Sequence, residues 1–291
     1  MDPTWWNQTL VSVYNLRLIT EIDFCIALLS AIGCITNISL ATYWKTIGYE
    51  KIMVIGISTM DFISSIAALF LPVDFGDNTT LCQVVSFWKN FGFGGSFAWS
   101  CCIAHSLYIQ INKGRDPTNC IFYYVCISVF VALYNGILAV VTHYSEIISI
   151  GLCYHMGATG YGNYLVNTVP SLIAVFICLT FYCMITRSRI YKEENLRGLF
   201  FYPLILIVCI GPKLYKDLSE QITKSPSPDV LYFITAPLYL SQGLWNSIAY
   251  GISRVIVAHC KLKVLHPTQS MNSDDQYEEL TVEPIHGSAD H

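Results

Sequence analysis

The sequence contains few charges: only 12% of its 291 residues are charged, whereas 54% are hydrophobic. A soluble domain carries about 25% charged residues, so this composition favours a membrane protein. No basic stripe accompanies the net charge of −4, so no nucleic-acid partner is expected. The first twenty residues lack the basic and long apolar regions of a cleaved signal peptide. The first spanning segment is therefore expected to act as its own insertion signal.

Seven stretches are long and apolar enough to cross a bilayer, which needs roughly 20 apolar residues per helix. They cover residues 23–44, 52–73, 82–111, 119–142, 161–186, 198–222 and 230–254. None shows the alternation of a transmembrane β-strand. The sequence therefore predicts an all-α membrane protein with a seven-transmembrane helix bundle over residues 22–256. Residues 1–21 precede this bundle, and residues 257–291 form a tail.

The positive-inside rule predicts the orientation, because eleven of the sixteen lysines and arginines fall on one side of the predicted bundle. The N-terminal segment is then outside, together with the glycosylation sequons at Asn7 and Asn78. After the last span, SRVIVAHCKLKVL predicts a short amphipathic helix that lies against membrane lipid, with Cys260 as a lipidation site. The alternative for this stretch is a plain basic stop-transfer flank.

Most of the twelve cysteines lie in mid-helix, where a thiol is a small hydrophobe. Cys82 and Cys153 differ, since both fall on the predicted outer side, where oxidising conditions favour a disulfide. Two unpaired thiols are the alternative, because sequence alone does not fix the pairing.

Three polar residues in different spans share one depth. Asp61 follows Lys51 by ten residues, or about 15 Å of helix. Asn37 and Asn246 each lie about 12 Å from the same predicted boundary. We expect a shared cluster, in which amide groups hydrogen-bond to the buried carboxylate. Three independent packing contacts are the alternative.

A second polar group is predicted in the outer half of the bundle. Lys89 follows Cys82 by two helical turns, and it is expected to pair either with an anionic ligand or with an outer acid. Lys213 and Lys216 follow the helix breaker Gly211-Pro212 and are further candidates for ligand binding. The alternative for both lysines is that they snorkel to the lipid headgroups. The aromatic candidates could equally belong to interfacial belts. The candidate ligand-binding residues are Lys89, Trp88, Tyr164, Lys213, Lys216 and Tyr239.

Three stretches, SFAWSCCIAHSLYIQI, FYPLILIVCIGP and QGLWNSIAYG, resemble the cyclic-AMP-receptor-like family of seven-transmembrane G-protein-coupled receptors. NSIAY stands where rhodopsin-like receptors have NPxxY, which argues against that group. The resemblance implies a plasma-membrane receptor that binds an extracellular small-molecule ligand and activates a heterotrimeric G protein. It also implies a Cys82–Cys153 disulfide, a polar relay through Asn37, Asp61 and Asn246, and a Tyr250 that moves on activation. The inner surface for the G protein would comprise residues 111–115, 187–197 and Arg254.

Other membrane functions fit the sequence less well. A channel or transporter is the main alternative, and it needs ionisable residues along a path between the two faces. A retinal protein needs a lysine in the last span, and residues 230–253 contain none. Histidines at metal-binding spacing are also missing. No enzymatic activity, metal or cofactor is therefore expected, and the lysines suggest a small anionic ligand.

Overall fold

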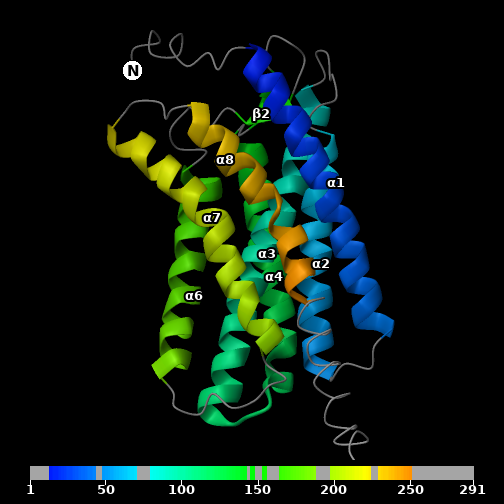
Figure 1. Ribbon diagram of the computed structural model, residues 1–291, viewed down its shortest axis with the longest axis vertical. Coiled ribbons are helices and arrows are strands. Elements are labelled where there is room, and N and C mark those ends of the chain that lie inside the picture. The colour runs from blue at the N-terminus through cyan, green and yellow to red at the C-terminus, as the bar shows by residue number, and fades with distance from the viewer. Residues whose placement is uncertain are drawn as a thin grey trace, which may run out of the picture.

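The computed structural model describes residues 13–43, 48–70, 79–142, 145–147, 153–155, 164–187, 197–223 and 229–250. This part of the chain is almost entirely helical, and its helices lie side by side along the long axis (Figure 1). The helices are α1 (Val13–Tyr43), α2 (Gly48–Leu69), α3 (Thr79–Lys113), α4 (Ile121–Val141), α6 (Val169–Arg187), α7 (Arg197–Thr223) and α8 (Asp229–Leu240), with residues 242–250 helical after a turn at Ser241. Each predicted range contains a helix. The prediction of a helical protein is confirmed.

Four short elements complete the described chain. A 3₁₀ turn, η2 (Pro117–Cys120), precedes α4, and a π-helical turn, η3 (Tyr164–Thr168), precedes α6. The strands β1 (Ser145–Ile147) and β2 (Cys153–His155) pair antiparallel. We call the end of the bundle that carries these strands the hairpin end (Figure 1). The end that carries η2 is the far end.

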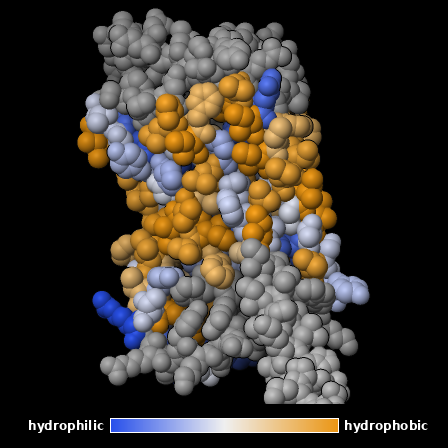
Figure 2. All heavy atoms as spheres, in the orientation of Figure 1, coloured by the Kyte–Doolittle hydropathy of each residue, from blue (hydrophilic) through white to orange (hydrophobic). Residues whose placement is uncertain are grey.

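Within the described residues, four helical segments are long and apolar enough to cross a membrane: Leu18–Tyr43, Gly48–Leu69, Pro117–Val141 and Val169–Arg187. Their outward faces present large apolar side chains, as with Phe122 at 73% exposure and Phe176 at 71%. Figure 2 shows that such side chains cover much of the visible face of the described helices. Exposed apolar surface of this extent needs lipid around it. The chain is therefore a membrane protein.

Two of the other three helices, α3 and α7, carry polar side chains into the bundle, and the third, α8, is short. Helix α3 buries Lys89 and Asn90, together with four serines. Helix α7 has four charged residues between Lys213 and Glu220. Helix α8 ends at Leu240, where Ser241 interrupts the run before residues 242–250.

Helix α3 is central, since it packs against α2, α4, α6 and α7. A glycine permits one of these contacts. A Cβ atom at Gly92 would lie 2.6 Å from the Met60 carbonyl oxygen and 2.6 Å from the Ser64 backbone nitrogen. The backbones of α2 and α3 therefore approach more closely than any side chain at this position would permit.

Prolines interrupt α7 and α8. Pro203 and Pro212 lie inside α7, which bends visibly in Figure 1. Pro237 lies inside α8. Its carbonyl accepts a hydrogen bond from the Ser241 backbone nitrogen at 2.9 Å, and Ser241 accepts one from Trp245 at 3.0 Å. The two helical pieces are thus joined by a hydrogen-bonded turn.

Candidate functional site

A buried carboxylate lies in the middle of the bundle. Asp61 of α2 is 4% exposed, and its Oδ2 accepts a hydrogen bond from the Asn246 side-chain amide at 2.7 Å. Asn246 is itself 1% exposed. This distance is at the short end of the range for N–H···O hydrogen bonds. It joins two helices whose residues are 185 positions apart in the sequence.

A serine and a glutamine extend this contact to α3. Ser96 hydrogen-bonds to Asp61 through its side chain. The Ser96 hydroxyl also accepts a hydrogen bond from the Gln242 side-chain amide at 2.9 Å. One hydroxyl therefore connects α2, α3 and the helical residues 242–250.

Helix α1 joins the same layer through Ser30, whose hydroxyl accepts a hydrogen bond from Ser65 at 3.0 Å. Close approach of residues 242–250 to this layer depends on Gly243, since a Cβ there would meet Ser30, lie 2.9 Å from Cys34 Sγ and lie 3.1 Å from Asp61 Cβ. We call this layer the middle polar cluster; it comprises Ser30, Asp61, Ser65, Ser96, Gln242 and Asn246.

Asn37 occupies an adjacent position. Its side-chain amide donates to the Ser58 hydroxyl at 3.3 Å, one turn before Asp61 on α2. The structure thus brings Asn246 into direct contact with Asp61, whereas Asn37 reaches α2 at Ser58. The amide oxygens of Asn37, Gln242 and Asn246 are buried without a hydrogen-bond partner among the described residues. The layer can therefore accept further hydrogen bonds if its helices move.

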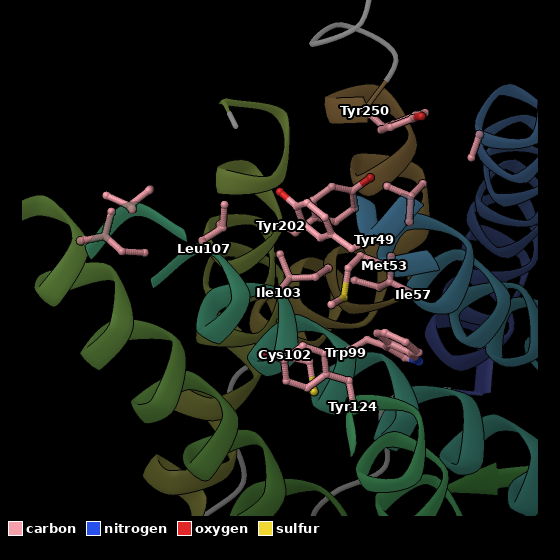
Figure 3. Close-up of a cluster of buried hydrophobic side chains, with 14 residues drawn as sticks. Tyr49, Met53, Ile57, Trp99, Cys102, Ile103, Leu107, Tyr124, Tyr202 and Tyr250 are labelled. Atoms are coloured by element: carbon pink, nitrogen blue, oxygen red, sulfur yellow. The ribbon is translucent and has the colours of Figure 1, made fainter. Parts of the chain in front are cut away.

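Tyr250 lies one turn beyond Asn246, and it is 3% exposed. It belongs to a buried apolar cluster between Asp61 and the far end, shown in Figure 3. Tyrosine side chains from α2 and α7 join it there, as do aliphatic and aromatic residues of α2 and α3. We call this the far apolar cluster; its labelled members are Tyr49, Met53, Ile57, Trp99, Cys102, Ile103, Leu107, Tyr124, Tyr202 and Tyr250.

A second layer of polar side chains lies toward the hairpin end. Lys89 is 7% exposed and interacts electrostatically with Asp23 of α1 and with Lys213 of α7. It precedes Ser96 by seven residues, which places it about 10 Å above the middle polar cluster.

Ion pairs along α7 complete this layer. The Lys213 ammonium lies 2.7 Å from Asp217 Oδ2, and the Lys216 ammonium lies 3.3 Å from both Asp217 and Glu220. Lys213 Nζ also lies 5.3 Å from the centroid of the Tyr239 ring. We call the ionisable members the charged cluster: Asp23, Lys89, Lys213, Lys216, Asp217 and Glu220.

The structure therefore brings together four of the six predicted ligand-binding residues, namely Lys89, Lys213, Lys216 and Tyr239. Lys216 is 8% exposed and ion-paired, which excludes snorkelling for this residue. Trp88 does not join them. It is 47% exposed and lines a hollow of about 340 Å³ between α2 and α3, beside Phe62 and Leu81.

Several predicted positions lie outside the described residues: Asn7, Asn78, Cys260 and the amphipathic helix after the last span. The side chains of Tyr164 and Cys153 are also outside them. Cys82 is disulfide-bonded. The hairpin strand β1 packs against α3, the helix that carries Cys82. The pairing of Cys82 with Cys153 stays a prediction.

Sequence reasoning missed Asp23 and Ser96. A periodicity contained the necessary information, because residues seven apart lie on one face of a helix. Asp23, Ser30 and Asn37 follow this spacing on α1, and Lys89 and Ser96 follow it on α3. On both helices, this seven-residue spacing connects a residue of the charged cluster with a residue of the middle polar cluster.

The fold and the buried polar layers define a helical membrane protein with a polar interior. No family model matches the sequence, and no curated protein matches it.

Proposed function

We propose that this protein is a seven-transmembrane G-protein-coupled receptor of the plasma membrane, of the cyclic-AMP-receptor-like type. The hairpin end faces outward and takes up a small ligand at the charged cluster. The far end faces the cytoplasm and recruits a heterotrimeric G protein. The protein has no enzymatic role in this proposal. The carrying observation is the order of the polar groups along the bundle: the partly buried charged cluster lies toward the hairpin end, the middle polar cluster lies below it, and the far apolar cluster follows.

Each layer has a role in this proposal. A ligand at the charged cluster biases the bundle only if it binds two conformations with different affinity. The middle polar cluster lies about 10 Å below and joins four helical segments, so a shift of one segment changes hydrogen bonds on the others. The far apolar cluster keeps the cytoplasmic ends of α2, α3 and α7 together. Its opening would uncover the G-protein surface.

The bends in α7 and α8 support such a change. Pro212 separates the part of α7 that carries the charged cluster from the part that carries Tyr202. A proline removes one backbone hydrogen bond and leaves a point where a helix bends at low cost. Motion at the charged cluster can therefore swing the far part of α7.

The layers argue against a channel or transporter. Such a protein needs polar groups from one face to the other. Among the described residues, the buried ionisable side chains between Asp61 and the far end reduce to Glu50, eleven residues away on α2. The far apolar cluster fills the interval between them. Among the described residues of this cluster, an ion would meet tyrosine hydroxyls but no charged ligand.

The proposal is tested by loosening the far apolar cluster. Leu107 is 1% exposed within it, and Leu107→Ala removes apolar contacts that hold the closed arrangement. We expect ligand-independent G-protein activation to rise at least about fivefold, which corresponds to about 1 kcal/mol. The measurement uses cells that express the chain with a panel of G-protein activation reporters.

Two controls accompany this measurement. Leu133→Ala makes the same chemical change at a position on α4 that is 42% exposed, and it should leave the basal signal unchanged. Scrambling residues 188–196 should abolish the signal of Leu107→Ala. Ion or solute flux without any reporter response in either variant would instead establish a transporter.

A further inference from the structure

The charged cluster is electrically balanced. It has three ammonium groups, on Lys89, Lys213 and Lys216, and three carboxylates, on Asp23, Asp217 and Glu220. The lysines alone had suggested an anionic ligand. An anion that entered this layer would add an uncompensated negative charge to a poorly hydrated site, which is costly. A ligand without net charge keeps the balance.

The two sides of the cluster differ in how their charges are used. On α7, two ion pairs follow i, i+4 spacing, and Asp217 contacts both lysines. On α1, Asp23 Oδ1 is buried and has no hydrogen-bond partner among the described residues. A buried carboxylate oxygen without a donor is a costly feature, and it is the natural acceptor for an N–H group of a ligand.

We propose that the ligand is a small zwitterion with a protonated amine that bears N–H groups, such as a free α-amino acid. Its ammonium donates to Asp23, and its carboxylate lies between Lys89 and Lys213, which interact with each other electrostatically. The amine must carry hydrogen, because a quaternary ammonium cannot donate to Asp23 Oδ1. This inference deepens the proposed receptor function and relies on it for the biological role.

The test separates ligand class from signalling. The full-length chain, purified in lipid nanodiscs, is heated with each of four probe sets: the free L-α-amino acids, their N-acetyl derivatives, their methyl esters and their N-trimethyl betaines. These sets carry both charges, the anion alone, the cation alone, and both charges without N–H. We expect stabilisation by at least one free amino acid, at a concentration at least about tenfold lower than for its derivatives.

A matched pair of variants identifies the acceptor. Asp23→Asn should weaken binding of the stabilising amino acid at least about tenfold, since a charge-assisted hydrogen bond is lost. Glu21→Gln makes the same change on the same helix at an exposed position, and it should change binding by less than about twofold. Equal weakening by both variants would overturn the assignment of Asp23.

The remaining outcomes are distinct. The inference is overturned if N-acetyl derivatives or betaines bind as tightly as the free amino acids, or if no probe stabilises the protein. Binding of free amino acids with silent G-protein reporters would leave the inference standing and refute the receptor function. Reporter responses to the anionic N-acetyl derivatives alone would support the receptor function and overturn the inference of a zwitterionic ligand.

Discussion

The hydrogen bond between Asp61 and Asn246 predicts a measurable coupling energy. A double-mutant cycle with Asp61→Leu and Asn246→Leu removes each partner in turn, with side chains of similar volume. Asn246→Leu alone leaves a carboxylate that is 4% exposed with fewer donors. The free energy of unfolding of the Asn246→Leu variant should therefore fall by about 1–3 kcal/mol, which is the cost of an unsatisfied buried polar group.

The expected coupling lies at the upper end for membrane proteins. Hydrogen bonds between membrane helices average about 0.6 kcal/mol, with a maximum near 1.7 kcal/mol, because the unfolded chain in lipid also finds partners. The bond here is 2.7 Å long, fully buried and accepted by a carboxylate, all of which strengthen it. We therefore expect a coupling of about 1.5 kcal/mol between the two substitutions.

The assay measures the free energy of unfolding in bicelles for the four proteins of the cycle. Asn90 provides a control, since it is 3% exposed and donates to the Ser86 carbonyl of its own helix at 2.8 Å. A cycle of Asp61→Leu with Asn90→Leu should show coupling below about 0.5 kcal/mol. If the Asp61–Asn246 cycle gave no more than this, the middle polar cluster would not hold the helices together as described.

Two further predictions concern the framework. Gly92→Ala should lower the free energy of unfolding by about 1–3 kcal/mol, because the added Cβ meets rigid backbone, whereas Gly48→Ala, with nothing within 4 Å, should stay within about 0.5 kcal/mol. Hydrogen bonds from the Thr118 hydroxyl, at 2.6 Å, and its backbone nitrogen, at 2.9 Å, hold the pKa of Asp116 below its ordinary value. Asp116 therefore stabilises the fold above the ordinary Asp pKa, and this contribution disappears as the pH falls through the lowered value. A pH titration of unfolding should show the wild type converging on Asp116→Ala in acid; a constant difference would contradict the assignment.

Hydropathy located the helices well because lipid demands a long apolar run whatever the neighbours are. It was less informative for α3 and α7, where polar residues face other helices instead of lipid. The expectation for Trp88 shows the limit. Trp88 and Lys89 are consecutive, and consecutive helical residues point about 100° apart. Lys89 is buried and Trp88 is 47% exposed, whereas the consecutive residues Lys89 and Asn90 are both buried, so position along the helix alone did not decide which candidate faces inward.

Partners across helices were harder to predict than positions along them. Counting residues from the predicted membrane boundary placed Asn246 at the depth of Asp61, and the two side chains are in contact. The same arithmetic cannot supply the rotation of each helix, so it did not separate Asn37, which binds Ser58, from Gln242, which binds Ser96. Asp23 was missed for a similar reason: Lys89, with which it interacts electrostatically, lies on a different helix, α3.

The distribution of ion pairs has a consequence for how the chain enters the bilayer. Moving a charged side chain to the membrane centre costs about 2.5–3.5 kcal/mol on insertion scales. Helix α7 carries its own compensation, because Lys213 with Asp217 and Lys216 with Glu220 pair within a single helix. Helix α3 does not, since the acid that faces Lys89 belongs to α1. Insertion of α3 is therefore most favourable after α1 is already in the membrane, because Asp23 of α1 can then interact with Lys89. We expect α1 to insert before α3 and to lower the free-energy cost of inserting it.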